Sequence, residues 1–434
     1  MSALLVACSG SDGAGTPANP PDTTSLDTTA SETTDDASPA STATPTPQPT
    51  AEPTTAPTLQ PTTTDTRAPL AAPAGDAFFL PPTPMPGEAP GDVIWARAIA
   101  DPPAGSRGWQ VLYRSESVAG DPVAVSGVVF TPDNPVAPEL PVLSWAHGTT
   151  GLGDSCAPSR AYTIDGSSEW QLAQVVLGFG WAFVATDYEG LGTPGVHPYL
   201  VGQSEGRGVL DIVRAAQQLD GSAVGPTSQV AIFGHSQGGH AALMAAELAS
   251  SYAPELDVVG TVAAAPPGDI ALIESSSAAS TGELAGGFSL MIDAGFLAAY
   301  PDLPIDAVIA PEAREALIAV GDTCTGGAFE LAASIPGTQR DGTVDPQWAA
   351  AYAANSPGSV APSAPVLLIH GDADDLVPPV LSELILDDYC ALGVSVQRTV
   401  YAGANHITVI ADAFTDVRFW LASRMSGAPV DTSC

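Results

Sequence analysis

Short segments rich in valine and other apolar residues alternate with longer helix-like segments along most of this chain. The stretches "WQVLYRSES" and "PVAVSGVVFTP" predict a pair of strands around the turn at Gly120-Asp121, and "PVLSWAHG" predicts a buried strand. Helix-like "SEWQLAQVVLGFG" and "EGRGVLDIVRAAQQL" then alternate with strand-like "WAFVATDYEG" and "SQVAIFG". In the final helix-like segment, the spacing places four apolar residues on one helical face: Ile410, Phe414, Val417 and Leu421. This order predicts an α/β domain with a mostly parallel sheet.

Two segments depart from the alternation. Residues 9–75 are almost entirely Thr, Pro, Ala, Ser and Asp, which cannot bury enough apolar surface to fold, so we expect a disordered, extended stalk. Residues 267–363 contain short Ala- and Leu-rich pieces separated by Gly and Pro, which predicts an inserted helical cap or lid. The α/β core then comprises residues 76–266 and 364–434.

The chain begins with "MSALLVAC", whose last four residues, Leu5 to Cys8, resemble the lipobox of a bacterial lipoprotein signal peptide. A basic start and most of an apolar core are missing, which indicates a truncated signal peptide. Because the stalk follows directly, we expect lipidation at Cys8 and a folded domain that is secreted or anchored at the cell surface. The alternative is an ordinary cysteine near the terminus.

The folded part is strongly acidic. The formal net charge is −36 and all twelve basic residues are arginines; beyond residue 75, 40 acidic residues stand against 11 arginines. Such a surface disfavours nucleic acid and anionic membranes as partners, which leaves a lipid anchor at Cys8 as the expected membrane contact. We expect a monomer.

Four cysteines follow Cys8, at positions Cys156, Cys324, Cys390 and Cys434. An even number in a chain that carries export features, without Cys-x-x-Cys spacing, predicts two disulfides in one of three pairings. No H-E-x-x-H or comparable ligand cluster occurs, so we expect neither a metal nor another cofactor.

The motif that points to chemistry is Gly234-His235-Ser236-Gln237-Gly238, which fits the G-x-S-x-G pattern. In this pattern the serine occupies a tight strand-to-helix turn and the glycines permit close approach of backbone. Here a strand-like segment precedes the motif and a helix-like segment follows it. The pattern therefore predicts a nucleophile at Ser236; the alternative is a serine that caps its helix.

A serine nucleophile needs an imidazole base, which a carboxylate orients. On the α/β-hydrolase fold these groups follow in the order serine, acid, histidine. The order and local context argue against His147, His197, His235, His240 and His370. His406 remains, on a loop after the last strand. The acid should come from "GDADDLVPP", where Asp372, Asp374 and Asp375 all qualify by position.

An acyl transfer site also needs N–H donors for the oxyanion of its tetrahedral intermediate. One donor should be the backbone amide of Gln237, the residue after the nucleophile. The other should come from the glycine-rich loop "WAHGTTG", which nominates Thr149 or Thr150. Ordinary loop polarity is the alternative for both threonines.

The motifs "SWAHGTTG", "CAPS", "DYEGLG", "GHSQGG", "HGDADDLVP" and "GANH" together resemble the secretory lipase family, the Candida lipase A-like α/β-hydrolases. The resemblance implies that Asp374 is the acid, with Asp372 second. It also implies the disulfides Cys156–Cys324 and Cys390–Cys434 and a helical cap between serine and acid. One departure is Thr150, where the fungal members carry an acid.

These residues favour hydrolysis of neutral carboxylic esters, including lipid esters, through an acyl-enzyme. A short-chain carboxylesterase, a polyesterase or an acyltransferase would use the same serine, acid and histidine. A binding protein built on an inactive hydrolase scaffold is a further hypothesis, and peptidase activity has no supporting feature. Reaction with a serine-directed phosphonate separates an active site from an inactive scaffold.

Overall fold

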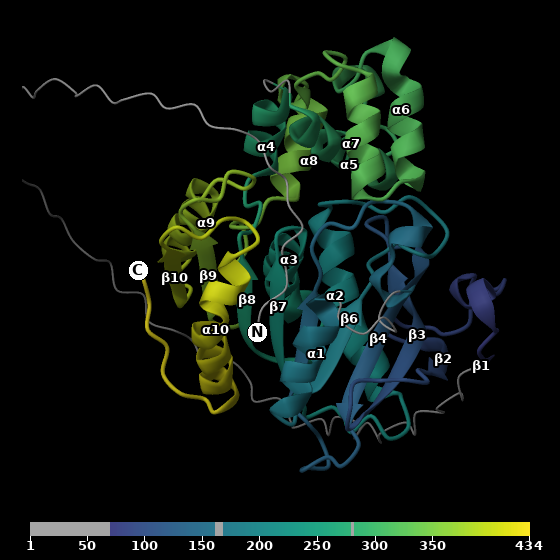
Figure 1. Ribbon diagram of the computed structural model, residues 1–434, viewed down its shortest axis with the longest axis vertical. Helices are drawn as coiled ribbons and strands as arrows, with labels where there is room; N and C mark the ends of the chain where they lie inside the picture. Colours follow the sequence, from purple (N-terminus) through teal and green to yellow (C-terminus); the bar gives the residue numbers. More distant parts are fainter. Residues whose placement is uncertain (1–69, 161–167, 279–281) are drawn as a thin grey trace, which may run out of the picture. The chain divides into compact units, whose positions relative to one another are not determined.

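One ten-stranded sheet runs through the described residues of this computed structural model, which are 70–160, 168–278 and 282–434. The strand order is β1-β2-β3-β4-β6-β5-β7-β8-β9-β10 (Figure 1). The strands are β1 (Leu70–Ala71), β2 (Val93–Ala98), β3 (Ser106–Glu116), β4 (Pro122–Pro132), β5 (Val142–Ala146), β6 (Ala182–Thr186), β7 (Gln229–His235), β8 (Asp257–Ala264), β9 (Val366–Gly371) and β10 (Val396–Tyr401). All neighbours from β6 to β10 are parallel. The predicted α/β fold with a mostly parallel sheet is confirmed.

The sheet starts slightly earlier than the sequence indicated. Leu70 and Ala71 pair with Trp95 and Ala96 of β2, although composition assigned residues 70–75 to the stalk. A strand of two residues can pair with the edge strand of a sheet through its backbone, and this needs little burial of its side chains. The lipobox segment, Cys8 and residues 9–69 of the stalk lie outside the described residues.

Helices cover both faces of the sheet. The core helices are α1 (Ser168–Gly178), α2 (Gly202–Gln217), α3 (Gln237–Tyr252), α9 (Val380–Ala391) and α10 (Val409–Met425). Successive strand residues point to opposite faces. Val142 of β5 therefore packs in the cluster that contains α2 and α3, whereas Leu143 packs in the cluster that contains α1 and α10. Helix α9 packs against β9 and β10 on the α3 side.

The last helix packs on the sheet largely as its spacing predicted. Val417 and Leu421 are buried in the cluster that contains α10, and Ile410 packs against that cluster. Phe414 departs from the prediction, because it is 37% exposed, whereas Ala413 and Trp420 are buried. A β-carbon on Gly260 of β8 would lie only 3.0 Å from the Trp420 ring, so the bare backbone there makes room for the indole.

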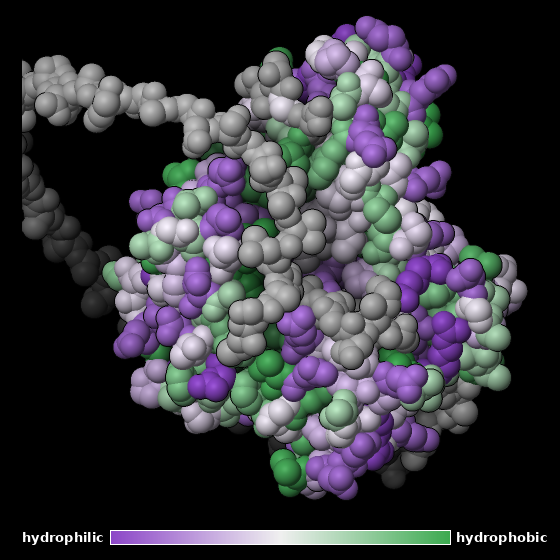
Figure 2. Space-filling model, in the orientation of Figure 1, coloured by the Kyte–Doolittle hydropathy of each residue, from purple (hydrophilic) through white to green (hydrophobic). Residues whose placement is uncertain are grey.

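The insertion between β8 and β9 folds into five helices within the described residues. These are α4 (Ile270–Ala278), α5 (Glu283–Ala299), α6 (Arg314–Ala319), α7 (Thr325–Ser334) and α8 (Pro346–Ala354). They are grouped at one end of the sheet (Figure 1) and enclose an apolar core of their own around Phe296, Trp348 and Tyr352. On the face drawn in Figure 2, hydrophilic and hydrophobic residues are interspersed over the surface. We call α4 to α8 the cap.

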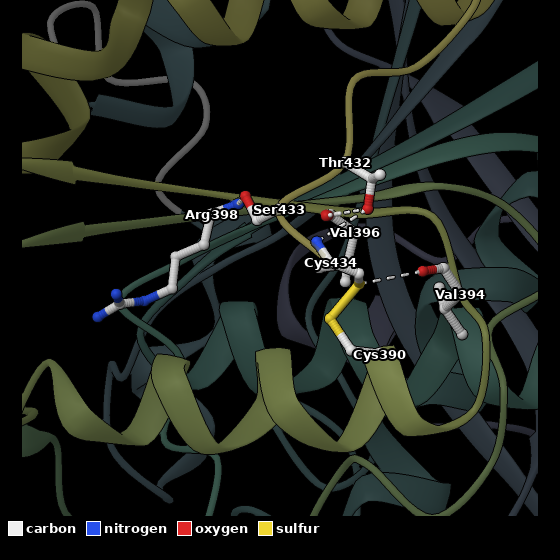
Figure 3. Close-up of a disulfide and its surroundings, with 7 residues drawn as sticks. All are labelled: Cys390, Val394, Val396, Arg398, Thr432, Ser433 and Cys434. Carbon is white, nitrogen blue, oxygen red and sulfur yellow. Dashed lines mark hydrogen bonds between the residues drawn. A yellow bond between two sulfur atoms is a disulfide. The ribbon is translucent and has the colours of Figure 1, made fainter.

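A disulfide attaches the C-terminal segment to the edge of the sheet. Cys434 is joined to Cys390 of α9, and the preceding residues run beside β10 (Figure 3). The Ser433 amide donates to the Val396 carbonyl at 2.8 Å, and the Arg398 amide donates to the Ser433 hydroxyl at 2.9 Å. The disulfide and these bonds together cover the exposed edge of β10, which would otherwise offer unpaired backbone groups.

Two carboxyl groups lie in the apolar interior of the cap. Glu274 of α4 and Asp293 of α5 are at most 1% exposed. The Ser289 hydroxyl donates to Glu274 at 2.8 Å, but one oxygen of each carboxyl finds no hydrogen-bond partner among the described residues. Burial raises the pKa of Glu274 from 4.5 to about 8, and burial and the charge of Glu274 raise the pKa of Asp293 well above its ordinary value.

The titration of Glu274 predicts a pH-dependent stability. The unfolded chain loses the Glu274 proton near pH 4.5 and the folded chain near pH 8, so folding is progressively disfavoured as the pH rises between these values. Glu274→Gln removes this penalty. Calorimetry at pH 5 and pH 8.5 gives the Tm of the variant minus the Tm of the wild type at each pH. This difference should be more positive at pH 8.5 than at pH 5, by about 2 °C or more.

The exposed Glu312 of the cap provides the matched control. Glu312→Gln should change the Tm equally little at both pH values. Parallel behaviour of the two variants across the pH range would contradict the assignment.

Candidate active site

Ser236 occupies a strained turn between β7 and α3. Its φ of 59° lies in the left-handed region, which side-chain-bearing residues rarely adopt. The turn closes tightly: a β-carbon at Gly234 would lie 1.9 Å from the Gly238 carbonyl oxygen, and one at Gly238 would lie 1.9 Å from the Ala146 carbonyl oxygen. Both glycines are therefore required for this geometry, and the Ser236 amide is held by the Ala264 carbonyl at 2.9 Å. The turn raises the serine hydroxyl above the carboxyl end of β7.

The structure brings Ser236, His406 and Asp374 together. The Nε2 atom of His406 lies 2.9 Å from the Ser236 Oγ, and its Nδ1 atom lies 2.8 Å from an Asp374 oxygen. Because β7, β9 and β10 are parallel, the loops that carry these residues leave the sheet at the same edge. Ser236 is partly exposed, whereas Asp374 and His406 are only 6% and 5% exposed.

Asp374 is held as a carboxylate by several donors. Its Oδ1 atom accepts the amides of Leu376 and Val377 at 3.0 and 2.9 Å. Burial raises its pKa, but hydrogen bonds from His370, His406 and the Val377 amide outweigh burial and bring the pKa below its ordinary value. Asp374 therefore stays ionised wherever the protein is folded at ordinary pH.

The other two candidate acids face elsewhere. Asp372 is exposed and accepts the Gly403 amide at 2.6 Å, which stabilises the turn after β10. Asp375 is also exposed. Position in the sequence could not separate the three acids, whereas the hydrogen bond to His406 does.

Two further histidines, His235 and His370, support this arrangement. The sequence analysis did not assign them this role. The Nε2 atom of His235 lies 2.8 Å from the His406 carbonyl oxygen, and burial lowers the pKa of His235 to about 4. His235 is thus a neutral donor that fixes the backbone of His406. The Nε2 atom of His370 lies 3.3 Å from the Asp374 carboxylate. The signal in the sequence was the position of both histidines at the carboxyl ends of central strands.

The predicted oxyanion residues lie beside Ser236. Gln237 is the first residue of α3, so its amide has no acceptor within the helix. Gly148 of the loop after β5 is so near that a β-carbon there would lie 3.8 Å from the Ser236 Cβ. The hydroxyl groups of Thr149 and Tyr199 are hydrogen-bonded at 2.7 Å, whereas the buried Thr150 hydroxyl finds no partner in the described part of the chain.

The cap fixes the loop that carries these threonines. The Thr325 amide at the start of α7 donates to the Thr150 carbonyl at 3.1 Å, and Gly151 forms a bridge with Cys324. A β-carbon on Gly151 would lie 2.4 Å from the Cys324 Cα, so only glycine permits this approach. The disulfide Cys156–Cys324 ties the same regions covalently. Both disulfides thus have the pairing that the resemblance implied.

Two further features, a metal-type cluster and a membrane-spanning helix, are not found among the described residues. No three His, Cys, Asp or Glu side chains among them come together as a metal site requires. No helix in that part of the chain combines the length and hydropathy that a membrane span needs.

Comparison with known proteins places this geometry in a family. A probable inactive lipase of Mycobacterium tuberculosis is 27% identical over 380 residues, which cover 82% of this chain and 83% of that protein. Lipase A of Arthroderma benhamiae is 26% identical over 391 residues, 83% of this chain and 81% of that protein. The structure of Candida antarctica lipase A in its closed state aligns with a TM-score of 0.68 at 22% identity and covers 80% of this chain and 84% of that chain.

The family model for secretory lipases matches residues 156–432, which include Ser236, Asp374 and His406. This match spans more than half of the sequence. The chain belongs to the secretory lipase family.

Proposed function

We propose that this chain is a serine hydrolase of neutral carboxylic esters, with Ser236 as nucleophile, His406 as base and Asp374 as orienting acid. The observation that carries the proposal is the unbroken chain of contacts from Ser236 Oγ through His406 to Asp374, at 2.9 and 2.8 Å. Secretory lipase membership supports lipase or esterase activity. One relative is called a probable inactive lipase, and the assembled contacts of this chain argue against inactivity here.

The reaction follows from the positions of these atoms. The Nε2 atom of His406 accepts the Ser236 proton as Oγ attacks the ester carbonyl, and the Asp374 carboxylate stabilises the imidazolium through Nδ1–H. His406 then gives the proton to the departing alkoxide, which leaves an acyl-enzyme on Ser236. Water, deprotonated by His406, releases the acid and restores the serine.

The oxyanion of each tetrahedral intermediate would lie between the Gln237 amide and the loop at Thr149 and Thr150. Backbone donors that are fixed before the reaction stabilise this charge without reorganisation. Both threonine hydroxyls can serve as the side-chain donor: Thr149 keeps its own proton when it accepts from the Tyr199 hydroxyl, and the Thr150 hydroxyl has no partner among the described residues. The Thr150 hydroxyl would replace the acid that fungal members carry at this position.

We assign medium- to long-chain acyl esters as substrates. The cap lies between the nucleophile and the acid in sequence and is rich in apolar side chains, which suits it to cover an acyl chain. The excess of acidic residues disfavours anionic substrates. Short esters should also react, because each missing methylene costs only a modest part of the binding energy.

The export features at the start of the chain support attachment at the cell surface. Lipidation at Cys8, followed by the Pro- and Thr-rich stalk, would hold the hydrolase away from a membrane. Both features lie outside the described residues.

Substitution of the three residues tests the mechanism. Ser236→Ala and His406→Ala should each lower kcat for a p-nitrophenyl ester by at least about 1000-fold, and Asp374→Asn somewhat less, while circular dichroism stays unchanged. Asp372→Asn is the matched control and should keep nearly full activity. Loss of activity in Asp372→Asn with full activity in Asp374→Asn would transfer the acid role to Asp372.

A chain-length series tests the substrate class. The purified domain should hydrolyse p-nitrophenyl esters from acetate to palmitate, and emulsified triglyceride, with a higher kcat/KM for octanoate than for acetate because the cap covers the longer chain. Turnover of acetate and butyrate without any turnover of octanoate would make the chain a short-chain carboxylesterase instead.

A further inference from the structure

A fully buried carboxylate lies behind the nucleophile turn, outside the three residues that carry the reaction. Glu205 of α2 is 0% exposed. Its Oε1 atom accepts the Leu200 amide at 2.9 Å and the Gln237 side-chain amide at 2.8 Å, and its Oε2 atom lies 3.0 Å from His240 Nδ1. A carboxylate in this position would be costly to bury without these partners.

The side chain of Gln237 is held by two acceptors. Its Nε2 atom lies 2.8 Å from Glu205 and 2.8 Å from the Nε2 atom of His197. His197 can accept because its Nδ1–H donates to the Glu189 carbonyl at 2.8 Å, and because burial lowers the pKa of His197 to about 4 and keeps the ring neutral. Both N–H bonds of the Gln237 amide are thereby used, and the residue is 1% exposed.

His240 closes the other side of the network. Its Nε2 atom lies 2.7 Å from the Asn355 carbonyl oxygen, which can only accept, so Nε2 carries a hydrogen. Its Nδ1 atom faces Glu205 Oε2, so His240 holds the second oxygen of the carboxyl group between Asn355 and α2. The pair thus fixes the Glu205 side chain behind the nucleophile turn.

The geometry points to Glu205 as a positioning residue for the oxyanion donor of Gln237. Glu205 touches neither Ser236 nor His406 in this structure; it acts by locking the side chain of the residue whose backbone N–H faces the oxyanion. The inference rests on the proposed function, because it assigns a role within that reaction. It explains why four polar groups meet in an otherwise apolar interior.

The test compares two variants that weaken the same contact from opposite sides. Glu205→Met keeps the length of the side chain and removes both acceptor oxygens, so the Gln237 side-chain amide loses this partner. Gln237→Met keeps the backbone N–H and removes the side-chain donor. Each should lower kcat by about tenfold with KM within twofold of the wild type, because the lost alignment acts on the transition state. The double variant should be no slower than the slower single variant, since both changes break one contact.

Glu247 of α3, the helix that begins at Gln237, supplies the matched control. It is also buried and accepts the Gly358 amide at 2.7 Å and the Tyr389 hydroxyl at 2.8 Å, away from the nucleophile turn. Glu247→Met should lower the Tm and leave kcat unchanged. A Glu205→Met variant with the same Tm loss and unchanged kcat would show a merely structural role and overturn the inference, as would additive effects in the double variant.

The outcomes separate this inference from the proposed function. If the wild type hydrolyses esters and Ser236→Ala does not, the function stands and the Glu205 variants decide the positioning role. If the wild type neither turns over esters nor reacts with a serine-directed phosphonate, the function fails and the positioning role fails with it. If Glu205→Met does not fold, Gln237→Met decides alone, and unchanged kcat in that variant refutes the role.

Discussion

The strained backbone at Ser236 is the constraint on which the site depends. A φ of 59° at a residue with a side chain persists only where the surroundings fix it. Here Gly234 and Gly238 let three backbone segments meet at contacts that no β-carbon would tolerate. The same close approach lifts the serine hydroxyl off the strand and frees the first amides of α3. The strain, the position of the proposed nucleophile and the free amide of the proposed oxyanion donor are therefore consequences of one turn.

The parallel sheet converts this local turn into an assembled site. Because β5, β7, β9 and β10 run in one direction, the loops that follow them gather at one edge although they are far apart in sequence. Neutral His235 then fixes the backbone of His406, and buried donors keep Asp374 ionised. Each reacting group is oriented by a partner that takes no part in bond changes, which is how preorganised sites avoid reorganisation during reaction.

The fold class and two of the site residues could be predicted, because their sequence patterns reflect local structure. Alternating segments gave the fold class, and the glycine pattern with chain order led to Ser236 and His406. Asp374 required family resemblance, since three acids share one loop. The burial of Trp420 rather than Phe414 on α10 could not be predicted, because the space that Gly260 leaves for Trp420 exists only in the folded state. The Glu205 network was missed as well, although a lone glutamate four residues before Val209, on the buried side of α2, was a readable signal.

The cap also contacts the segments that carry the proposed oxyanion donors. Its α7 end holds the loop at Thr150 and Gly151, and Asn355 at the end of α8 accepts from His240 behind Gln237. Both proposed sources of oxyanion donors are thus supported by hydrogen bonds to the backbone of the cap region. If the cap lifted away as one rigid body, it would break both supports at the moment when substrate enters. If the proposed function holds, we therefore expect the start of α7 and the end of α8 to stay against the core when substrate binds, with any rearrangement confined to the rest of the cap.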